Sequence, residues 1–180
     1  MNSLIDQLTG SNYIAIIEFD STAKTMLNWN QMNAGGKALA KAAVDDMEDG
    51  NGTHYQLAFD QVDTILANIA ASGQLMPEEV VFLTDGAPRS SGDDEDSRDL
   101  ALANYEASQG SSPYYPSELD GDTFKAAWVR AQMLRENHGI SVSTIAIDTG
   151  SSSDEYELLK AMAEDNNSAG PSGWVSEVSL

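Results

Sequence analysis

The sequence predicts an α/β protein with a three-layer, doubly wound (Rossmann-like), mostly parallel sheet and helices on both of its faces. Short apolar runs alternate with amphipathic helical stretches along the chain. The run at 79–84 is apolar without alternation, which is typical of a strand buried on both faces of a parallel sheet. The 180 residues fit one domain, so we expect a single domain over residues 1–180.

The first third of the chain predicts two helices around a pair of strands. Residues 1–8 read as the end of a helix, and 12–19 as a buried strand rich in Ile. A short returning strand is expected at 25–29. Ala and Leu at helical spacing predict a helix over 36–48, which Asp49-Gly50-Asn51-Gly52 ends.

The next helix and strand carry the candidate site residues. An apolar stripe predicts a helix over 54–71, directly after Gly52-Thr53, where Thr53 as the N-cap would explain a Thr at this place. The strand at 79–84 then ends in Asp85-Gly86. Because ligands bind outside the carboxyl ends of such strands, Asp85 is a candidate to hold a cation or a substrate. A turn with no further role is the alternative.

An insertion is predicted at about 89–121. Its first part, 89–99, carries four consecutive carboxylates but lacks the spacing of a calcium loop, which favours a mobile acidic loop. A short helix is expected at 99–107. The Pro- and Tyr-rich stretch at 110–116 is irregular, and its tyrosines either contact a partner or cover an edge of the core.

The last third predicts two more strands and two helices. Asp122 is expected to cap a helix over 123–137, and 140–147 to form a strand near the edge of the sheet, since it is less apolar than 80–83. Ser152 and Glu155 match a capping box for a helix that ends at Ala163. Residues 173–178 complete the sheet as a last strand.

Composition excludes several classes of partner. Nine Lys and Arg against 29 Asp and Glu give a formal charge of −20, which repels nucleic acid and anionic membranes. No apolar run reaches the roughly 20 residues of a membrane span, so we expect a soluble chain without membrane insertion. There is no Cys, hence no disulfide or thiolate site. The acidity suits an extracellular, cell-surface or high-salt setting.

The order of these elements resembles a von Willebrand factor type A (vWA) domain. The resemblance lies in 19–23, 52–58, 80–88 and 139–147, and it extends over nearly the whole chain. It implies a divalent cation, usually Mg²⁺ and otherwise Ca²⁺ or Mn²⁺, with Thr53 as the hydroxyl ligand and Asp85 as the carboxylate ligand. Such oxygen ligands suit Mg²⁺ and leave a coordination position for an acidic group of a protein partner.

The Asp-x-Ser-x-Ser motif of that family is absent. Asp20-Ser21-Thr22-Ala23-Lys24 is a poor copy, because the Lys24 ammonium would oppose a cation. The resemblance therefore implies an N-terminally incomplete domain that lacks its first, central strand. Since unsatisfied backbone groups in the core cost about 1–3 kcal/mol each, we expect another polypeptide to supply that strand.

Three functions follow from the resemblance. The leading one is a non-catalytic adhesion or protein-binding module whose cation site is completed in trans. The alternative is a structural or assembly subunit of a surface fibre or larger particle, with a non-functional metal site. A metal-dependent hydrolase is disfavoured, because no general base is placed beside the candidate ligands.

Overall fold

A computed structural model describes residues 2–48, 50–89, 93–110, 113–117, 119, 121–147, 153–164 and 173–178. The chain divides into two compact units, Met1–Pro77 and Glu78–Leu180. The expectation of one domain over 1–180 stays a prediction.

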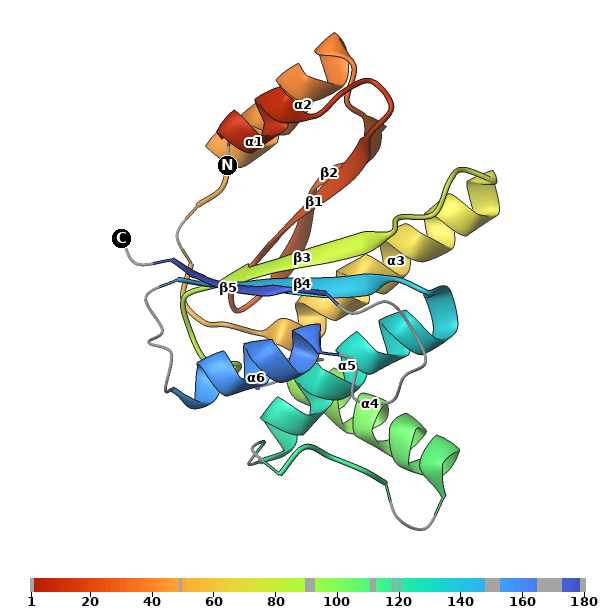
Figure 1. The fold of residues 1–180 in the computed structure, drawn as a ribbon, viewed down its shortest axis with the longest axis vertical. Helices are drawn as coiled ribbons and strands as arrows, with labels where there is room; N and C mark the ends of the chain where they lie inside the picture. Colours follow the sequence, from red (N-terminus) through yellow and green to blue (C-terminus); the bar gives the residue numbers. More distant parts are fainter. Residues whose placement is uncertain are drawn as a thin grey trace. The chain divides into compact units, whose positions relative to one another are not determined.

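The first unit is built around an antiparallel hairpin (Figure 1). Its elements are α1 (Asn2–Gln7), β1 (Tyr13–Phe19), β2 (Ala23–Gln31), α2 (Ala34–Asp45) and α3 (Tyr55–Ser72). Helices α1 and α2 pack together on one side of the hairpin, around a core of Ile5, Met32 and Ala40. Helix α3 covers the other side, where the rings of Phe19 and Tyr55 meet edge to face at 5.9 Å.

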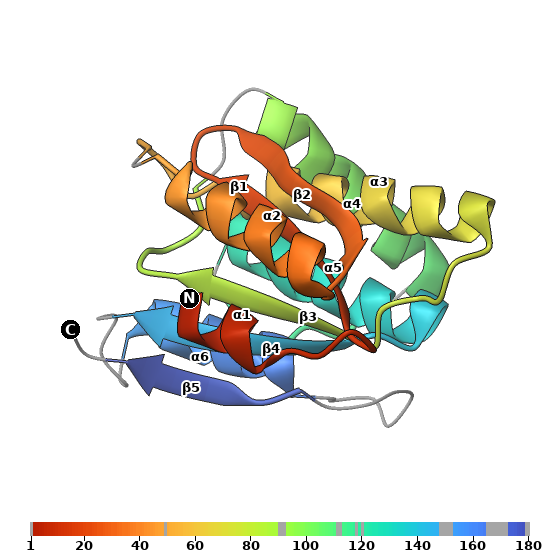
Figure 2. The ribbon, with the colours of Figure 1, turned by 90° about the horizontal axis from the view of Figure 1, so that it is seen from above.

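The second unit is a parallel sheet with three helices. Two of them contact the sheet, and the third packs on one of these two. Its elements are β3 (Glu79–Thr84), α4 (Asp93–Gln109), α5 (Asp122–His138), β4 (Ser141–Ile147), α6 (Asp154–Ala163) and β5 (Val175–Val178). The strands lie in the order β3-β4-β5 (Figure 2). Helices α5 and α6 pack on β4, and α4 packs on α5. No helix of the described residues is long and apolar enough to cross a membrane.

The predicted fold class is confirmed as α/β with a parallel sheet and helices, but the continuous three-layer sheet is not what the structure shows. The described strands form a three-stranded parallel sheet and a separate antiparallel pair. Strand β1 was expected to be buried, yet every one of its residues is only half-buried. Among the described strands only β2 pairs with β1, so one of the two edges of β1 has no strand paired to it.

The predicted places of two strands in the sheet are reversed. The apolar run at 79–84 forms an edge strand, in which Val81 is 44% exposed, whereas the more polar run at 141–147 forms the buried centre. Two hydroxyls make this possible. Thr144 donates to the carbonyl of Leu159 at 2.9 Å, and Ser143 donates to the carboxylate of Glu79. Buried polar groups with such partners carry little penalty.

Helix starts also differ from the predictions. The acidic stretch at 93–96 begins α4 rather than forming a mobile loop, because carboxylates are favoured in the first turn of a helix. Helix α3 has His54 as its N-cap, not Thr53, and α5 has Gly121, not Asp122. The predicted cap Ser152 lies outside the described residues, and the observed cap of α6 is its neighbour Ser153, whose hydroxyl accepts from the Tyr156 N–H.

The tyrosines of the insertion cover the core. The rings of Tyr105, Tyr114 and Tyr115 lie 5.7, 6.0 and 6.2 Å from that of Trp128, which is fully buried. Burial, and then the charge of Glu106, raises the pKa of Tyr115 to about 12. Of the two predicted roles, the structure favours the covering of the core.

Candidate functional site

Asp85 lies where β3 ends, as predicted. Its side chain is exposed, while the turn is held by its neighbour: the Thr84 hydroxyl donates to the Gly86 carbonyl at 3.1 Å, and the Gly86 N–H donates to Thr84 Oγ1 at 3.3 Å. The hydrogen bonds of this turn therefore do not need the Asp85 carboxylate. An exposed carboxylate at the carboxyl end of a parallel strand is placed to bind a ligand.

Thr53 lies in the first unit, in the half-buried corner before α3. The corner is fixed to the hairpin, because the His54 N–H donates to the Asp20 carbonyl at 2.8 Å. Gly52 has φ 129°, which a side chain rarely adopts, so a Gly is required directly before Thr53. Asp85 belongs to the second unit, and a cation site shared by the two residues stays a prediction.

The turn between β1 and β2 explains why Asp20 is followed by polar residues. Asp20 Oδ1 accepts from the Thr22 N–H at 2.6 Å and from its hydroxyl at 3.0 Å. The hydrogen bond from the Thr22 N–H contributes most to lowering the pKa of the Asp20 carboxyl. This is the local bonding of an Asx turn, so the structure accounts for the stretch without a metal-binding role.

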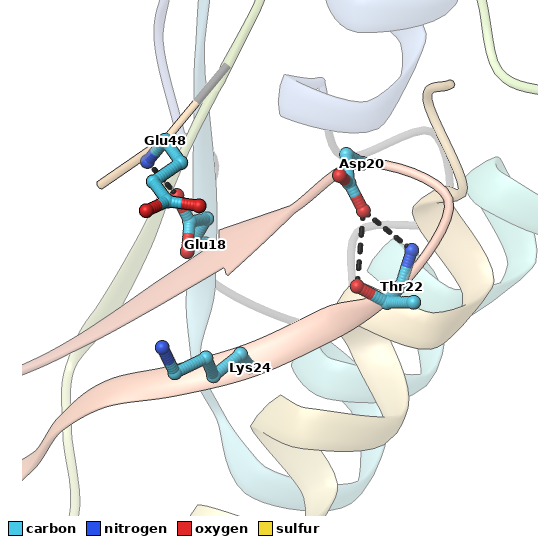
Figure 3. A pocket seen from close by; sticks show the side chains of 5 residues that line it. All are labelled: Glu18, Asp20, Thr22, Lys24 and Glu48. Carbon is cyan, nitrogen blue, oxygen red and sulfur yellow. Dashed lines mark hydrogen bonds between the residues drawn. The ribbon is translucent and has the colours of Figure 1, made fainter. Parts of the chain in front are cut away.

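A pocket of about 210 Å³ lies beside this turn (Figure 3). It is lined by three carboxylates, one hydroxyl and one ammonium: Glu18, Asp20, Glu48, Thr22 and Lys24. Glu18 accepts from the backbone N–H of Glu48 at 2.6 Å, and this pair lies apart from the Asp20 turn. The described residues contain no group of three His, Cys, Asp or Glu that could hold a metal ion, here or elsewhere.

These observations test whether the chain's own residues fit the cation that the family resemblance implies. Mg²⁺ requires near-octahedral oxygen coordination and is usually held by one or two carboxylates together with waters or ligand oxygens. Thr53 and Asp85 offer one hydroxyl and one carboxylate, and the described residues contain no group of three His, Cys, Asp or Glu that could hold a metal ion. One hydroxyl and one carboxylate leave most coordination positions of Mg²⁺ to waters or to the oxygens of a partner.

The resemblance implied an unpaired strand edge, and what sequence reasoning missed is that this edge lies on β3, which was expected to be buried on both faces. The Ser141 N–H donates to the Glu78 carbonyl at 3.0 Å. This bond identifies which residues point their backbone groups toward β4, namely Glu78 and every second residue after it. Because these directions alternate along a strand, the N–H and C=O groups of Glu79, Val81 and Leu83 point the other way. No described strand pairs with β3 on that side.

The other edge of this sheet is protected against pairing. Strand β5 has only four residues, and it places the exposed Glu177 among them. Short strands and charged side chains are common means of blocking an edge. In β3 the central residues Val80 to Leu83 are all apolar, so β3 lacks such protection. The signal in the sequence was this apolar run, which we interpreted as burial by the chain itself.

The parallel sheet with its helices defines an α/β domain, in which Asp85 lies at the end of a strand. The chain belongs to the von Willebrand factor type A family, whose model matches residues 1–172. Domains of this family are generally non-catalytic and typically bind proteins or act in adhesion. No curated protein matches the chain.

Solved structures show the same fold at low sequence identity. A von Willebrand factor type A protein from Catenulispora acidiphila is 16% identical, with a TM-score of 0.58 over 98% of this chain and 32% of its own. Proximal thread matrix protein 1 from the mussel byssus is 17% identical, with a TM-score of 0.57 over 99% of this chain and 36% of its own. The SpRpn10 VWA domain is 9% identical, with a TM-score of 0.54 over 99% and 69%. The chain thus spans about a third of the first two structures.

Proposed function

We propose that the chain is a non-catalytic protein-binding module that takes up an extended segment of its partner along the open edge of β3. The observation that carries this proposal is that no described strand pairs with β3 on the side away from β4. A long apolar edge strand presents unpaired backbone groups and invites pairing with another chain. An added strand would gain affinity from main-chain hydrogen bonds and specificity from alternate side chains. We propose that this segment supplies the central strand of the sheet.

The proposed cation site depends on the same event. Thr53 and Asp85 would bind Mg²⁺, or Ca²⁺ or Mn²⁺, once the partner segment supplies carboxylate or hydroxyl oxygens. The net charge of −20 supports attraction of cations and of basic partner segments, and it suits an extracellular or cell-surface location. Metal binding by the isolated chain is expected to be weak, because its own ligands are too few.

The experiment is fluorescence anisotropy with a labelled peptide in which Val and Thr alternate between flanking lysines. We expect the chain to bind this peptide. We expect no binding of a matched peptide in which every second Val is Pro, because Pro removes the N–H that the added strand must donate. Equal binding of both peptides would show charge attraction alone and would contradict strand addition.

Two variants locate the site on the chain. Val81→Pro removes an N–H that points to the open edge, so the sheet should tolerate it while peptide binding is lost. Glu177→Pro is the matched control on the opposite edge, because the Thr144 N–H donates to the Trp174 carbonyl and the backbone groups of Glu177 therefore point away from β4. Binding lost in Glu177→Pro and kept in Val81→Pro would refute the proposal.

The second candidate is a structural or assembly subunit with a non-functional metal site. The small donor set around Thr53 and Asp85 favours it. The same assay separates the two functions, because a cation-dependent module would bind a carboxylate-containing version of the peptide more tightly with Mg²⁺. A structural subunit would bind it equally with Mg²⁺ and with EDTA, and Asp85→Asn would then leave binding unchanged.

A further inference from the structure

The pair Asn51-Gly52 lies in the corner between α2 and α3, in the first unit. Asn51 is exposed, and the pair belongs to no helix or strand. Among the described residues, neither the Asn51 side chain nor the Gly52 N–H has a hydrogen-bond partner, and the next backbone hydrogen bond along the chain is that of the His54 N–H. The Asn51 amide and the nitrogen that follows it are therefore unrestrained and adjacent.

Such a pair reacts with itself. The Gly52 nitrogen, after it has lost its proton to water, forms a bond with Asn51 Cγ, and the Cγ–Nδ2 bond breaks as Nδ2 takes up a proton and leaves as ammonia. One water molecule then opens the five-membered succinimide at either of its two ring C–N bonds, which gives aspartate or isoaspartate. The attack is intramolecular and needs no enzyme, cofactor or oxidant, because adjacent groups have a very high effective concentration.

The fold maintains the reactive pair. Gly52 has φ 129°, a conformation that side chains rarely adopt, so the corner requires a residue without a side chain directly after Asn51. A side chain at this position would shield the attacking nitrogen. The need for Gly at the corner thus leaves the Gly52 nitrogen accessible to Asn51 Cγ.

Asn33 is a matched control within the same unit. It caps α2, and its Oδ1 accepts from the Gly36 N–H at 3.0 Å. The cap holds the Asn33 side chain toward the first turn of the helix, and the next residue is Ala34, whose methyl group shields its nitrogen. Asn33 must therefore break its cap before it can react.

We infer that Asn51 is a site of spontaneous deamidation, a modification that adds one negative charge to the corner before Thr53. In the isoaspartate form the backbone also gains one atom, because the chain then continues through the former side chain. The inference concerns adjacent residues of one loop, and it does not depend on the proposed partner.

The corner has little room for a longer backbone. A Cβ at Gly50 would lie 1.7 Å from Asp20 Oδ2, and a Cβ at Gly52 would lie 3.1 Å from the Ser21 nitrogen. The residues on both sides of the modified position thus pack closely on the turn between β1 and β2. Isoaspartate must loosen this packing and shift Thr53, and the new charge is added beside a turn that already carries the Asp20 carboxylate.

The test follows deamidation of the full chain in mildly alkaline buffer, folded and in urea, by peptide mapping with mass spectrometry. We expect Asn51 to react at a similar rate in both states, because the fold does not hold its side chain. Asn33 should react roughly tenfold or more slowly in the folded chain than in urea, because its cap must open first. Equal suppression of both residues in the folded chain, or no reaction at Asn51 in either state, would overturn the inference.

Two variants separate the effects of the charge and of the longer backbone. Asn51→Gln should stay unmodified over the same period, because its amide would need a six-membered ring, and it should keep its urea midpoint on ageing. Fresh Asn51→Asp carries the charge without the extra backbone atom, so its midpoint should fall less than that of the aged wild type. An aged wild type that contains isoaspartate and unfolds at the urea concentration of the fresh protein would contradict the effect on the corner. An equal fall in aged Asn51→Gln would contradict it as well.

Discussion

Two adjacent glycines at the start of α2 are expected to respond to the same substitution in opposite ways. A Cβ at Gly36 would lie 1.8 Å from the carbonyl oxygen of Gln31, whereas a Cβ at Gly35 would meet only Asn33 Oδ1, at 3.4 Å. The Gly36 N–H also donates to Asn33 Oδ1 at 3.0 Å, which caps the helix. Gly36→Ala must therefore displace backbone atoms and disturb the cap.

The free energies differ in sign. Overpacking of this kind costs about 1–3 kcal/mol, and a disturbed N-cap costs roughly 1 kcal/mol more. Gly35→Ala gains up to about 0.5–1 kcal/mol from helix propensity. Urea unfolding of the two variants and the wild type measures both effects. A Gly36→Ala protein as stable as Gly35→Ala would refute the close approach of α2 to the end of β2.

Three further predictions concern the sheet and the hairpin turn. Thr144→Val should lower the free energy of unfolding by about 1 kcal/mol in urea, because it removes the hydrogen bond to α6 at nearly constant volume; an unchanged value would contradict that bond. Gly173→Ala should destabilise by about 1–3 kcal/mol, since its Cβ would lie 1.8 Å from the Val142 carbonyl oxygen. Asp20→Asn should destabilise the protein at neutral pH but not in acid. The folded-state pKa of Asp20 is lowered from 3.8, so its contribution is present above that value and is lost as the pH falls through the folded-state pKa. A stability difference that persists at low pH would contradict this.

The sequence allowed most elements to be predicted, because hydrophobic periodicity and glycine stops are local signals. Gly73 and Gly139 both end helices in the left-handed conformation, as their positions indicated. The order of the strands was not accessible in the same way. Ser143 and Thr144 suggested an edge, but their hydroxyls find partners on β3 and α6 that only the tertiary structure supplies.

The candidate site was predicted in part. Asp85 is exposed at the end of β3 as expected, because the Thr-Asp-Gly pattern specifies both the end of the strand and the turn. An edge without its neighbouring strand was expected from the missing central strand, but its location on β3 was not predicted. An apolar run such as Val80 to Leu83 indicates that the strand is buried. It does not indicate whether the same chain or a partner chain buries it.

The most direct test of the account is backbone amide hydrogen exchange, residue by residue along β3, without and with the Val/Thr peptide. The account predicts slow exchange at Val80 and Phe82 in the chain alone, because their N–H groups point toward β4, and fast exchange at Val81 and Leu83. The peptide should then protect Val81 and Leu83. Slow exchange at Val81 without a partner, or no protection when the peptide is bound, would contradict the claim that β3 is an open edge for a partner strand.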